Sequence, residues 1–272
     1  MDHTERIAHF RAEASAFERA ARRALPPGRP APLVPSCPGW SVSDLIGHLG
    51  GVQRYVVHIL RERLTDAPDP GDPTLYGLPA DPDVLAAWPR PEGAPNRAAA
   101  PDALTSWYAQ GARALAGLFR ELGPDVPVWT WADEQSSGFW LRMQTIELAV
   151  HRWDAQSATG TPGPLAPALA ADAVTQTFEV MAPAARSRQQ APPGTGERFR
   201  FRRTDGPESW TVTCTAGELL LEPGSTGPAD VEAAAPASDL ALFLWRRLPP
   251  RALHVTGDAG LLPHWFTLVP PI

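Results

Sequence analysis

The sequence predicts an α+β protein in which a bundle of four helices precedes a small domain of short strands and helices. Over roughly the first 160 residues, apolar side chains recur every three or four positions in four long segments, which is the spacing of amphipathic helices. Beyond about residue 197 apolar and polar residues alternate, as in half-buried strands. A polar stretch at residues 187–197 separates the two patterns. We therefore expect a helical bundle over residues 1–187 and an α+β domain over residues 188–272.

The four bundle helices are bounded by recognisable start and stop signals. Pro26 and Pro27 end the first, and Ser41 begins the second, where Asp44 three residues later completes a capping box. A Pro- and Gly-rich connection at 67–101 separates the second helix from the third and is expected to close over one end of the bundle. Long connections between such helices are typical of a bundle. The helices are expected at residues 3–25, 41–63, 102–122 and 137–158.

A fifth helix at residues 165–185 is expected to complete the first domain. The second domain then begins with apolar residues at every other position, in runs bounded by Gly and Pro, which predicts short antiparallel strands. These strands lie around residues 199–201, 210–214 and 219–221, and a helix at 238–248, a strand at 252–255 and a helix at 259–268 follow.

Composition excludes several chemistries. The sequence contains no Lys, so its 24 basic residues are all Arg. A Schiff-base enzyme, a pyridoxal-phosphate enzyme and a P-loop nucleotide binder all need a Lys amine. Arg stays protonated and binds carboxylates as a planar donor. A general base must therefore be His, Asp, Glu, Tyr or Cys.

Charge and hydropathy favour a cytoplasmic protein that acts on a small molecule. The net charge of −6 and the pI of about 5.6 argue against nucleic-acid binding. The sequence has no apolar run long enough to span a membrane and no export signal at its start, so neither a membrane nor secretion is expected. Cys37 and Cys214 match neither a disulfide framework nor a thiolate zinc site.

Three polar residues fall on helix faces that should be apolar. His48 lies between Leu45 and Val52 on the second helix, and Glu147 and His151 are one turn apart on the fourth. Two nitrogens and one oxygen on facing helices would make a three-ligand metal site with one open position. The spacing alone leaves the alternative that Glu147 and His151 are a solvated or hydrogen-bonded pair.

Neighbouring residues allow two interpretations each. Asp154, three residues after His151, is either an acceptor that holds the His151 ring or a surface charge. Cys37 is either a nucleophile or a packed thiol, and we interpret it as packed because no His lies at a recognisable spacing from it. Trp40 is either a stacking platform or an anchor between its loop and the bundle, and we interpret it as an anchor.

Two segments resemble the mycothiol-dependent maleylpyruvate isomerase family. The segment VPSCPGWSVSDLIGHL, residues 34–49, resembles that family's opening motif, and RMQTIELAVHRWD, residues 142–154, looks like its second motif. A weaker similarity to the family's last motif lies in VTGDA, residues 255–259. The three segments stand in the family's order and span most of the chain.

This resemblance implies a fold, a metal and a thiol. The fold would be a DinB-like four-helix bundle joined to a domain related to sterol-carrier folds. The resemblance implies that zinc, or another divalent metal, is bound by His48, Glu147 and His151 and that mycothiol is the thiol cosubstrate. In a family isomerase the thiolate adds to a double bond, the resulting single bond rotates, and elimination follows. In a family transferase the thiolate stays attached to the electrophile.

The resemblance further implies an Arg from the C-terminal domain that binds a substrate carboxylate, and Arg247 is the local match. The alternative is that Arg247 only offsets a helix dipole at the surface.

Three functional hypotheses follow. The first is a mycothiol S-transferase or isomerase, the second is a metal hydrolase or lyase that needs no thiol, and the third is a binding protein without catalysis. The sequence predicts neither the substrate nor the oligomeric state.

Overall fold

The computed structural model describes residues 1–270. The chain forms two compact units, and the boundary between them in the sequence lies between Gly163 and Pro164. The first unit is helical and the second is a small sheet with helices, so the predicted α+β class is confirmed. The division lies earlier than the boundary expected at residue 187. The helix α6 (Pro167–Gln176) packs against α8 (Ala237–Leu244) of the second unit, whereas the sequence pattern had placed it in the bundle. Periodicity identifies a helix, but it does not identify the core that buries it.

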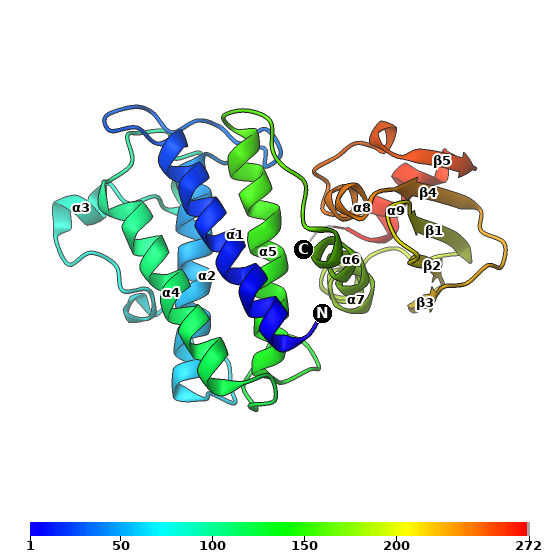
Figure 1. The fold of residues 1–272 in the computed structure, drawn as a ribbon, viewed down its shortest axis with the longest axis horizontal. Coiled ribbons are helices and arrows are strands. Elements are labelled where there is room, and N and C mark those ends of the chain that lie inside the picture. Colours follow the sequence, from blue (N-terminus) through cyan, green and yellow to red (C-terminus); the bar gives the residue numbers. More distant parts are fainter. Residues whose placement is uncertain (271–272) are drawn as a thin grey trace. The chain divides into compact units, whose positions relative to one another are not determined.

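Four long helices lie side by side in the first unit (Figure 1). Each lies within one residue of its expected bounds, since the apolar stripes and the stop signals agree. α1 packs against α5 and α4, and α2 packs against α4 and α5. Their bounds are His3–Ala24 for α1, Val42–Glu62 for α2, Ala103–Leu122 for α4 and Ser137–Ser157 for α5.

Side-chain caps start three of these helices, α1, α2 and α5. The expected capping box is present at α2, where Ser41 N donates to Asp44 Oδ2 at 2.7 Å and Asp44 N donates to Ser41 Oγ at 3.3 Å. At α5, Ser136 Oγ accepts from Phe139 N at 3.0 Å. Such caps satisfy backbone donors that a helix leaves unpaired at its first turn. They fix where α2 and α5 begin, and therefore which residues face the bundle interior.

The connection between α2 and α4 is mostly irregular, as expected, with short helical turns at η1 (Pro73–Tyr76), α3 (Pro82–Ala86) and η2 (Pro91–Gly93). It is held to the bundle at both ends. Asn96 N donates to Asp44 Oδ2 at 3.0 Å, and Trp107 Nε1 on α4 donates to Tyr76 O at 2.9 Å.

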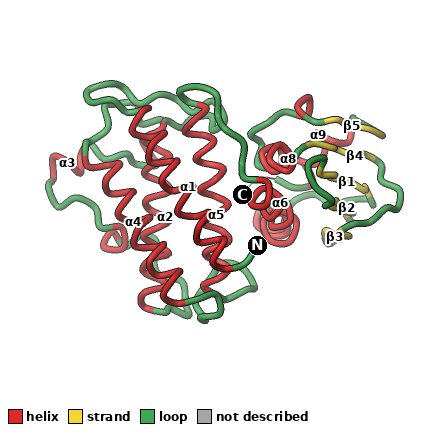
Figure 2. The backbone as a smooth tube through the Cα atoms, viewed as in Figure 1, coloured by secondary structure: helices red, strands yellow, loops and turns green. Residues whose placement is uncertain are grey.

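The second unit is a five-stranded sheet with helices, shown with its strands in yellow in Figure 2. The strand order is β3-β2-β1-β4-β5; β1 and β4 are parallel and the other pairs are antiparallel. The strand β4 is absent from the sequence-based expectation because its Ala-rich sequence has low strand propensity. The elements are α6, the π-helical turn η3 (Thr177–Met181), α7 (Ala182–Arg188), β1 (Glu197–Arg203), β2 (Ser209–Cys214), β3 (Leu219–Pro223), β4 (Val231–Ala235), α8, η4 (Pro250–Ala252), β5 (His254–Gly257) and α9 (Leu261–Leu268).

Alternation along β1 gives the sheet one buried and one polar face. Phe199 and Phe201 are fully buried and contact the Trp265 ring of α9, with ring centroids 5.2 and 5.3 Å apart. Between them, Arg200 points to the other face, where its Nη1 lies 3.5 Å from Glu232 Oε2 on β4. Side chains along β1 therefore alternate between the two faces of the sheet, as the sequence predicted.

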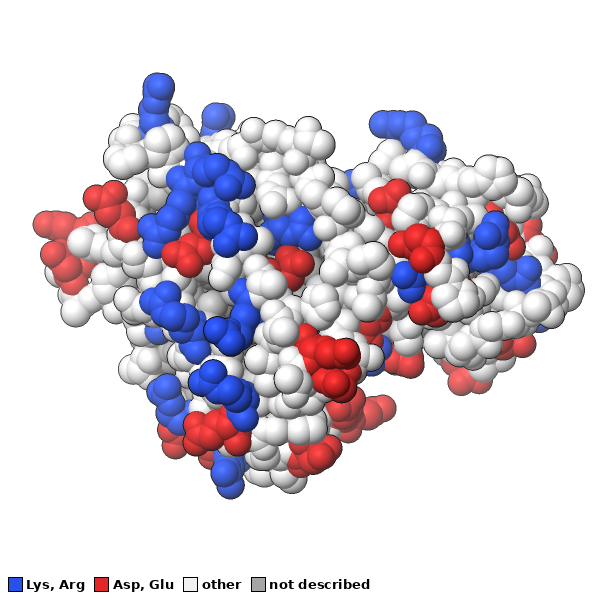
Figure 3. Space-filling view, viewed as in Figure 1, with Lys and Arg blue, Asp and Glu red and all other residues white. Residues whose placement is uncertain are grey.

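Charge on the first unit is uneven. Arginine side chains gather over the helices α1 and α4 on the face drawn in Figure 3. Arg11, Arg113 and Arg120 line a shallow groove of about 410 Å³ between these two helices. None of the expected metal ligands lines this groove. Among the helices of residues 1–270, none is long and apolar enough to cross a membrane.

Candidate metal centre

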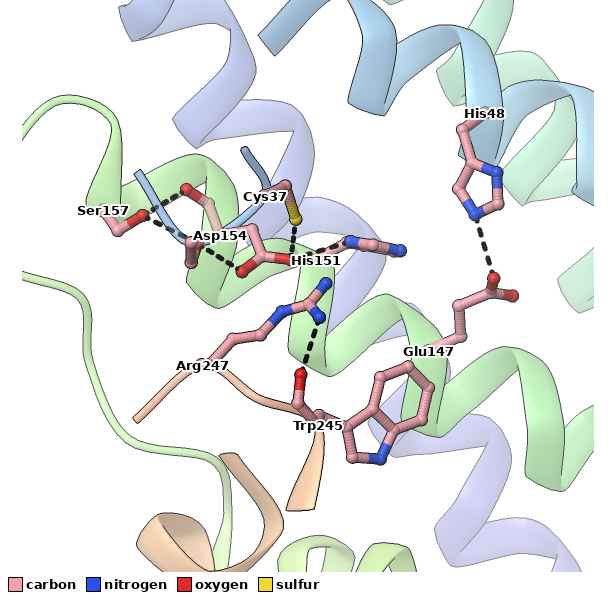
Figure 4. A network of polar contacts seen from close by, with 9 residues as sticks. Cys37, His48, Glu147, His151, Asp154, Ser157, Trp245 and Arg247 are labelled. Atoms are coloured by element: carbon pink, nitrogen blue, oxygen red, sulfur yellow. Dashed lines mark hydrogen bonds and ion pairs between the residues drawn. The ribbon is translucent and has the colours of Figure 1, made fainter. Parts of the chain in front are cut away.

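The three expected metal ligands come together between α2 and α5. Each offers a ligand atom, and the three atoms lie within 4.8 Å of one another. His48 Nε2 and Glu147 Oε1 are 2.9 Å apart, and the rings of His48 and His151 meet edge to face with centroids 5.2 Å apart. Figure 4 shows His48 opposite Glu147 across the gap between their helices.

Two features of the helices produce this meeting. His48 lies on α2 one turn after Asp44, the partner in the cap that sets the helix start. Glu147 and His151 are separated by one turn of α5, so their side chains project from the same face. α5 is buried on several faces, because α1, α2 and α4 all pack against it. Its polar residues therefore project into the bundle and not into solvent.

Exposure decreases steadily across the three side chains. His48 is 30% exposed, Glu147 is 16% exposed and His151 is 7% exposed. Water or a small molecule can therefore reach this cluster from the His48 side, while His151 is held inside the protein.

Burial and neighbouring charges fix the protonation of the two α5 residues. Burial alone would raise the pKa of Glu147, but the hydrogen bond with His48 and the nearby imidazoles outweigh it and lower this pKa. Burial lowers the pKa of His151 below its ordinary value, although Asp154 opposes the shift. Near neutral pH the cluster therefore presents a carboxylate and a neutral imidazole, which are the forms that bind metals.

The donor set suits a divalent cation. Two imidazole nitrogens and one carboxylate oxygen occur together in catalytic zinc sites, where a fourth position stays open for water or another ligand. An ion in such a site would also offset the cost of enclosing the Glu147 carboxylate.

Residues around the cluster hold its ligands. Gln144 Nε2 donates to Glu147 Oε2 at 2.9 Å, and His151 Nδ1 donates to Asp154 Oδ2 at 2.8 Å. Of the two interpretations of Asp154, the structure therefore supports the acceptor that holds the His151 ring, because the side chain is buried and is not a surface charge. Gln144 is not among the residues predicted for this site, although it lies one turn before Glu147, the spacing at which helix side chains meet.

The loop before α2 lies closer to the cluster than expected. Cys37 is half-buried and its Sγ donates to Asp154 Oδ2 at 3.3 Å, so it is hydrogen-bonded as well as packed. Cys37, His151 and Asp154 form a second group whose ligand atoms lie within 4.8 Å of one another. The Trp40 ring centroid lies 5.2 Å from that of His48 and 6.3 Å from that of His151, and the role of Trp40 as an anchor stays a prediction.

Arg247 belongs to the second unit, just after α8. It is half-buried, its backbone N donates to Leu242 O at 2.7 Å, and its Nη1 donates to Trp245 O at 2.7 Å. Its expected role at the metal centre stays a prediction.

The sequence matches the models of two domains of one protein family along most of its length. Residues 10–156 match the mycothiol maleylpyruvate isomerase N-terminal domain, and residues 168–264 match the corresponding C-terminal domain. The break between the two matches contains the division seen at Gly163 and Pro164. No curated protein matches the sequence.

Two solved structures of a mycothiol-dependent maleylpyruvate isomerase, one of them a mutant, are similar to the whole chain. Each covers 94% of this chain and 93% of its own, at 15% identity, with TM-scores of 0.58 and 0.57. A UbiJ-SCP2 ubiquinone synthesis protein covers 39% of this chain and 92% of its own at 22% identity, with a TM-score of 0.25. The first two similarities show a shared fold.

Proposed function

Because the chain belongs to the mycothiol maleylpyruvate isomerase family, we propose that it is a zinc-dependent enzyme that uses mycothiol to attack a small electrophilic substrate. The observation that carries the proposal is the cluster of His48, Glu147 and His151, whose ligand atoms lie within 4.8 Å of one another.

Each ligand has a distinct part. His151 is buried and neutral, so it supplies a ligand nitrogen that is shielded from solvent. Glu147 supplies a negative charge, and Gln144 holds its second oxygen in place. His48 lies at the exposed side, where a cosubstrate can approach. A divalent cation held by these residues would lower the pKa of a coordinated thiol, so that the nucleophilic thiolate is present near neutral pH.

The substrate is proposed to be a small molecule with an electrophilic double bond and a carboxylate. The chain has Arg and no Lys to bind such a carboxylate as a permanent cation, and Arg is well suited to do so through paired hydrogen bonds. We assign this role to Arg247, which the family resemblance indicated.

The direct test is product analysis with and without the thiol. Zinc-loaded protein would be incubated with maleylpyruvate, and with a set of other conjugated electrophiles, in the presence or absence of mycothiol. Mass spectrometry and NMR would identify the products, and His151→Ala would serve as the variant without a complete metal site. His58→Ala is the matched control, because His58 lies on α2 but belongs to neither ligand group.

The proposal predicts thiol-dependent turnover that His151→Ala abolishes and His58→Ala retains. Formation of the trans isomer with the thiol regenerated identifies an isomerase, and a stable thioether identifies a transferase. Identical products with and without mycothiol would contradict the thiol mechanism and favour metal-bound hydroxide. Ligand binding without any turnover would favour the non-catalytic alternative.

A further inference from the structure

The Asp154 carboxylate lies at a junction between the two helices that carry the metal ligands. It is fully buried on α5, and it accepts hydrogen bonds from two directions. From its own helix, His151 Nδ1 donates to Oδ2 at 2.8 Å. From the loop before α2, Ser36 Oγ donates to Oδ1 at 2.6 Å and Cys37 Sγ donates to Oδ2 at 3.3 Å. Figure 4 shows the contacts of His151 and Cys37 with the Asp154 side chain.

The burial of this carboxylate requires a reason. Enclosing an ionised carboxylate away from water is unfavourable unless hydrogen bonds replace its hydration. Donors from His151, Ser36 and Cys37 supply that replacement. An apolar residue would fill the position without this requirement. We therefore expect the Asp154 charge to position the groups that donate to it, which are His151, Ser36 and Cys37.

The contact with His151 selects one tautomer of the ring. An ionised carboxylate only accepts hydrogen bonds, so the proton of a neutral His151 ring lies on Nδ1. The lone pair is then on Nε2. Without the acceptor, the ring could rotate or place its proton on Nε2, and that nitrogen would lose its ability to bind an ion.

The contacts with Ser36 and Cys37 act on the other helix. Both residues lie in the short loop that leads into α2, and this loop is closed by hydrogen bonds from Val34 N to Trp40 O and from Trp40 N to Cys37 O. The loop ends at Ser41, the cap of α2, and Trp40 packs against the ring of His48. Asp154 thus joins the helix that carries His151 to the segment that positions His48.

We propose that Asp154 is a positioning residue, which fixes the Nδ1-H tautomer of His151 and ties the start of α2 to α5 so that both imidazoles face one cation. This inference rests on the proposed function as far as the cation is concerned, but the tautomer it assigns is a property of the protein without metal.

The first experiment therefore uses metal-free protein at a pH where His151 is neutral. Long-range ¹H–¹⁵N NMR of the full-length chain would identify the protonated nitrogen of each imidazole, and His151→Gln would assign the signal. The inference predicts Nδ1-H in the unmodified protein, whether or not a metal later binds. An Nε2-H signal from His151 would overturn it.

The second experiment measures the zinc dissociation constant by competition with a chelator. Asp154→Leu, of similar size without acceptors, should weaken zinc binding by roughly 10- to 100-fold, the range seen when such supporting contacts are removed. Asp154→Asn keeps one acceptor and should give a smaller loss, which covers the case in which Asp154→Leu fails to fold. Ser36→Ala with Cys37→Ala is the control for the loop contacts alone, because it removes them and keeps the His151 contact; its zinc affinity should fall less than that of Asp154→Leu.

The results separate the two proposals. Unmodified protein that binds no zinc contradicts the proposed function, while the NMR measurement still decides the role of Asp154. Zinc binding that is unchanged in folded Asp154→Leu or Asp154→Asn overturns the inference. An equal loss in the Ser36 and Cys37 control also overturns the tautomer role, because the carboxylate would then act only by holding the loop.

Discussion

The chemistry of the candidate centre depends on the charge states of a few side chains. Glu147 and His151 are one turn apart on α5; hydrogen bonds and neighbouring imidazoles lower the pKa of Glu147, and burial lowers that of His151. Both shifts favour the forms that hold a cation, since a protonated imidazole or carboxyl group cannot. The same shifts make the protein without metal sensitive to acid.

We predict that the metal-free protein loses stability as the pH falls. The unfolded chain protonates His151 at its ordinary pKa of 6.5, whereas in the folded protein burial holds this pKa lower. The stability that the neutral ring contributes is therefore full above about pH 6.5 and decreases below it. Because the pKa of Glu147 is also lowered from its ordinary value of 4.5, stability decreases further as the pH falls below about 4.5. Urea unfolding in the presence of a chelator at about pH 8 and about pH 5.5 measures the difference.

The control for this prediction is a pair of variants. His151→Gln should show a smaller loss between these two pH values than the unmodified protein, because its side chain does not titrate. His58→Gln should behave like the unmodified protein. Equal losses in all three proteins would assign the acid sensitivity to other groups.

At the scale of single residues, the sequence predicted that Glu147 and His151 lie close together, for a local reason. Glu147 and His151 are four residues apart, and the helix itself brings them together. The link from His48 to α5 depends on tertiary packing, and the family resemblance supplied it. The contact of Cys37 with Asp154 joins residues far apart in sequence, so no spacing could have indicated it.

At the scale of elements, close contact between α2 and α4 positions the helix that carries His48. Gly50 on α2 faces Trp107 on α4 so closely that a Cβ atom there would overlap Cζ3 of the indole. The Trp107 ring is held in turn, because its Nε1 donates to the carbonyl of Tyr76. The absence of a side chain at Gly50 therefore sets the distance between the two helices.

We predict that Gly50→Ala destabilises the protein by about 1–3 kcal/mol, the usual cost of overpacking a core. Gly117→Ala, in α4, is the matched control because nothing lies within 4 Å of the position that its methyl group would take. That change should stabilise the protein by about 0.5–1 kcal/mol through helix propensity. Thermal and urea unfolding would measure both, and equal effects would contradict the close contact.

Elements were predictable wherever local pattern and packing agree. The four bundle helices carry apolar stripes, α1, α2 and α5 also begin with side-chain caps, and the structure places all four as expected. The strand β4 has an Ala-rich sequence, and only its pairing with β1 and β5 makes it a strand. The helix α6 was recognised as a helix but assigned to the wrong core, since its burial depends on α8.

At the scale of the whole molecule, the two units contribute different functions to the proposed enzyme. The described residues of the first unit include every candidate metal ligand and Asp154. Arg247, proposed to bind the substrate carboxylate, belongs to the second unit. Metal binding should therefore be separable from substrate binding by single substitutions.

We predict that Arg247→Ala lowers kcat/KM for a carboxylate substrate by about ten- to a hundred-fold, as expected when a charged hydrogen bond is removed. Zinc content should not change. Steady-state kinetics and metal analysis would check both, with Arg251→Ala as the control, because Arg251 is an exposed arginine of the same unit. Unchanged kinetics in Arg247→Ala would assign substrate binding to another residue.

The most direct test of the metal centre is the zinc content of the dialysed full-length protein, measured by mass spectrometry after loading. The site predicts one zinc ion per chain, retained in His58→Ala and lost in His48→Ala, Glu147→Ala and His151→Ala. An unmodified protein that holds no zinc, or a folded His151→Ala variant that keeps a full equivalent, would contradict the assignment of this cluster as the metal centre.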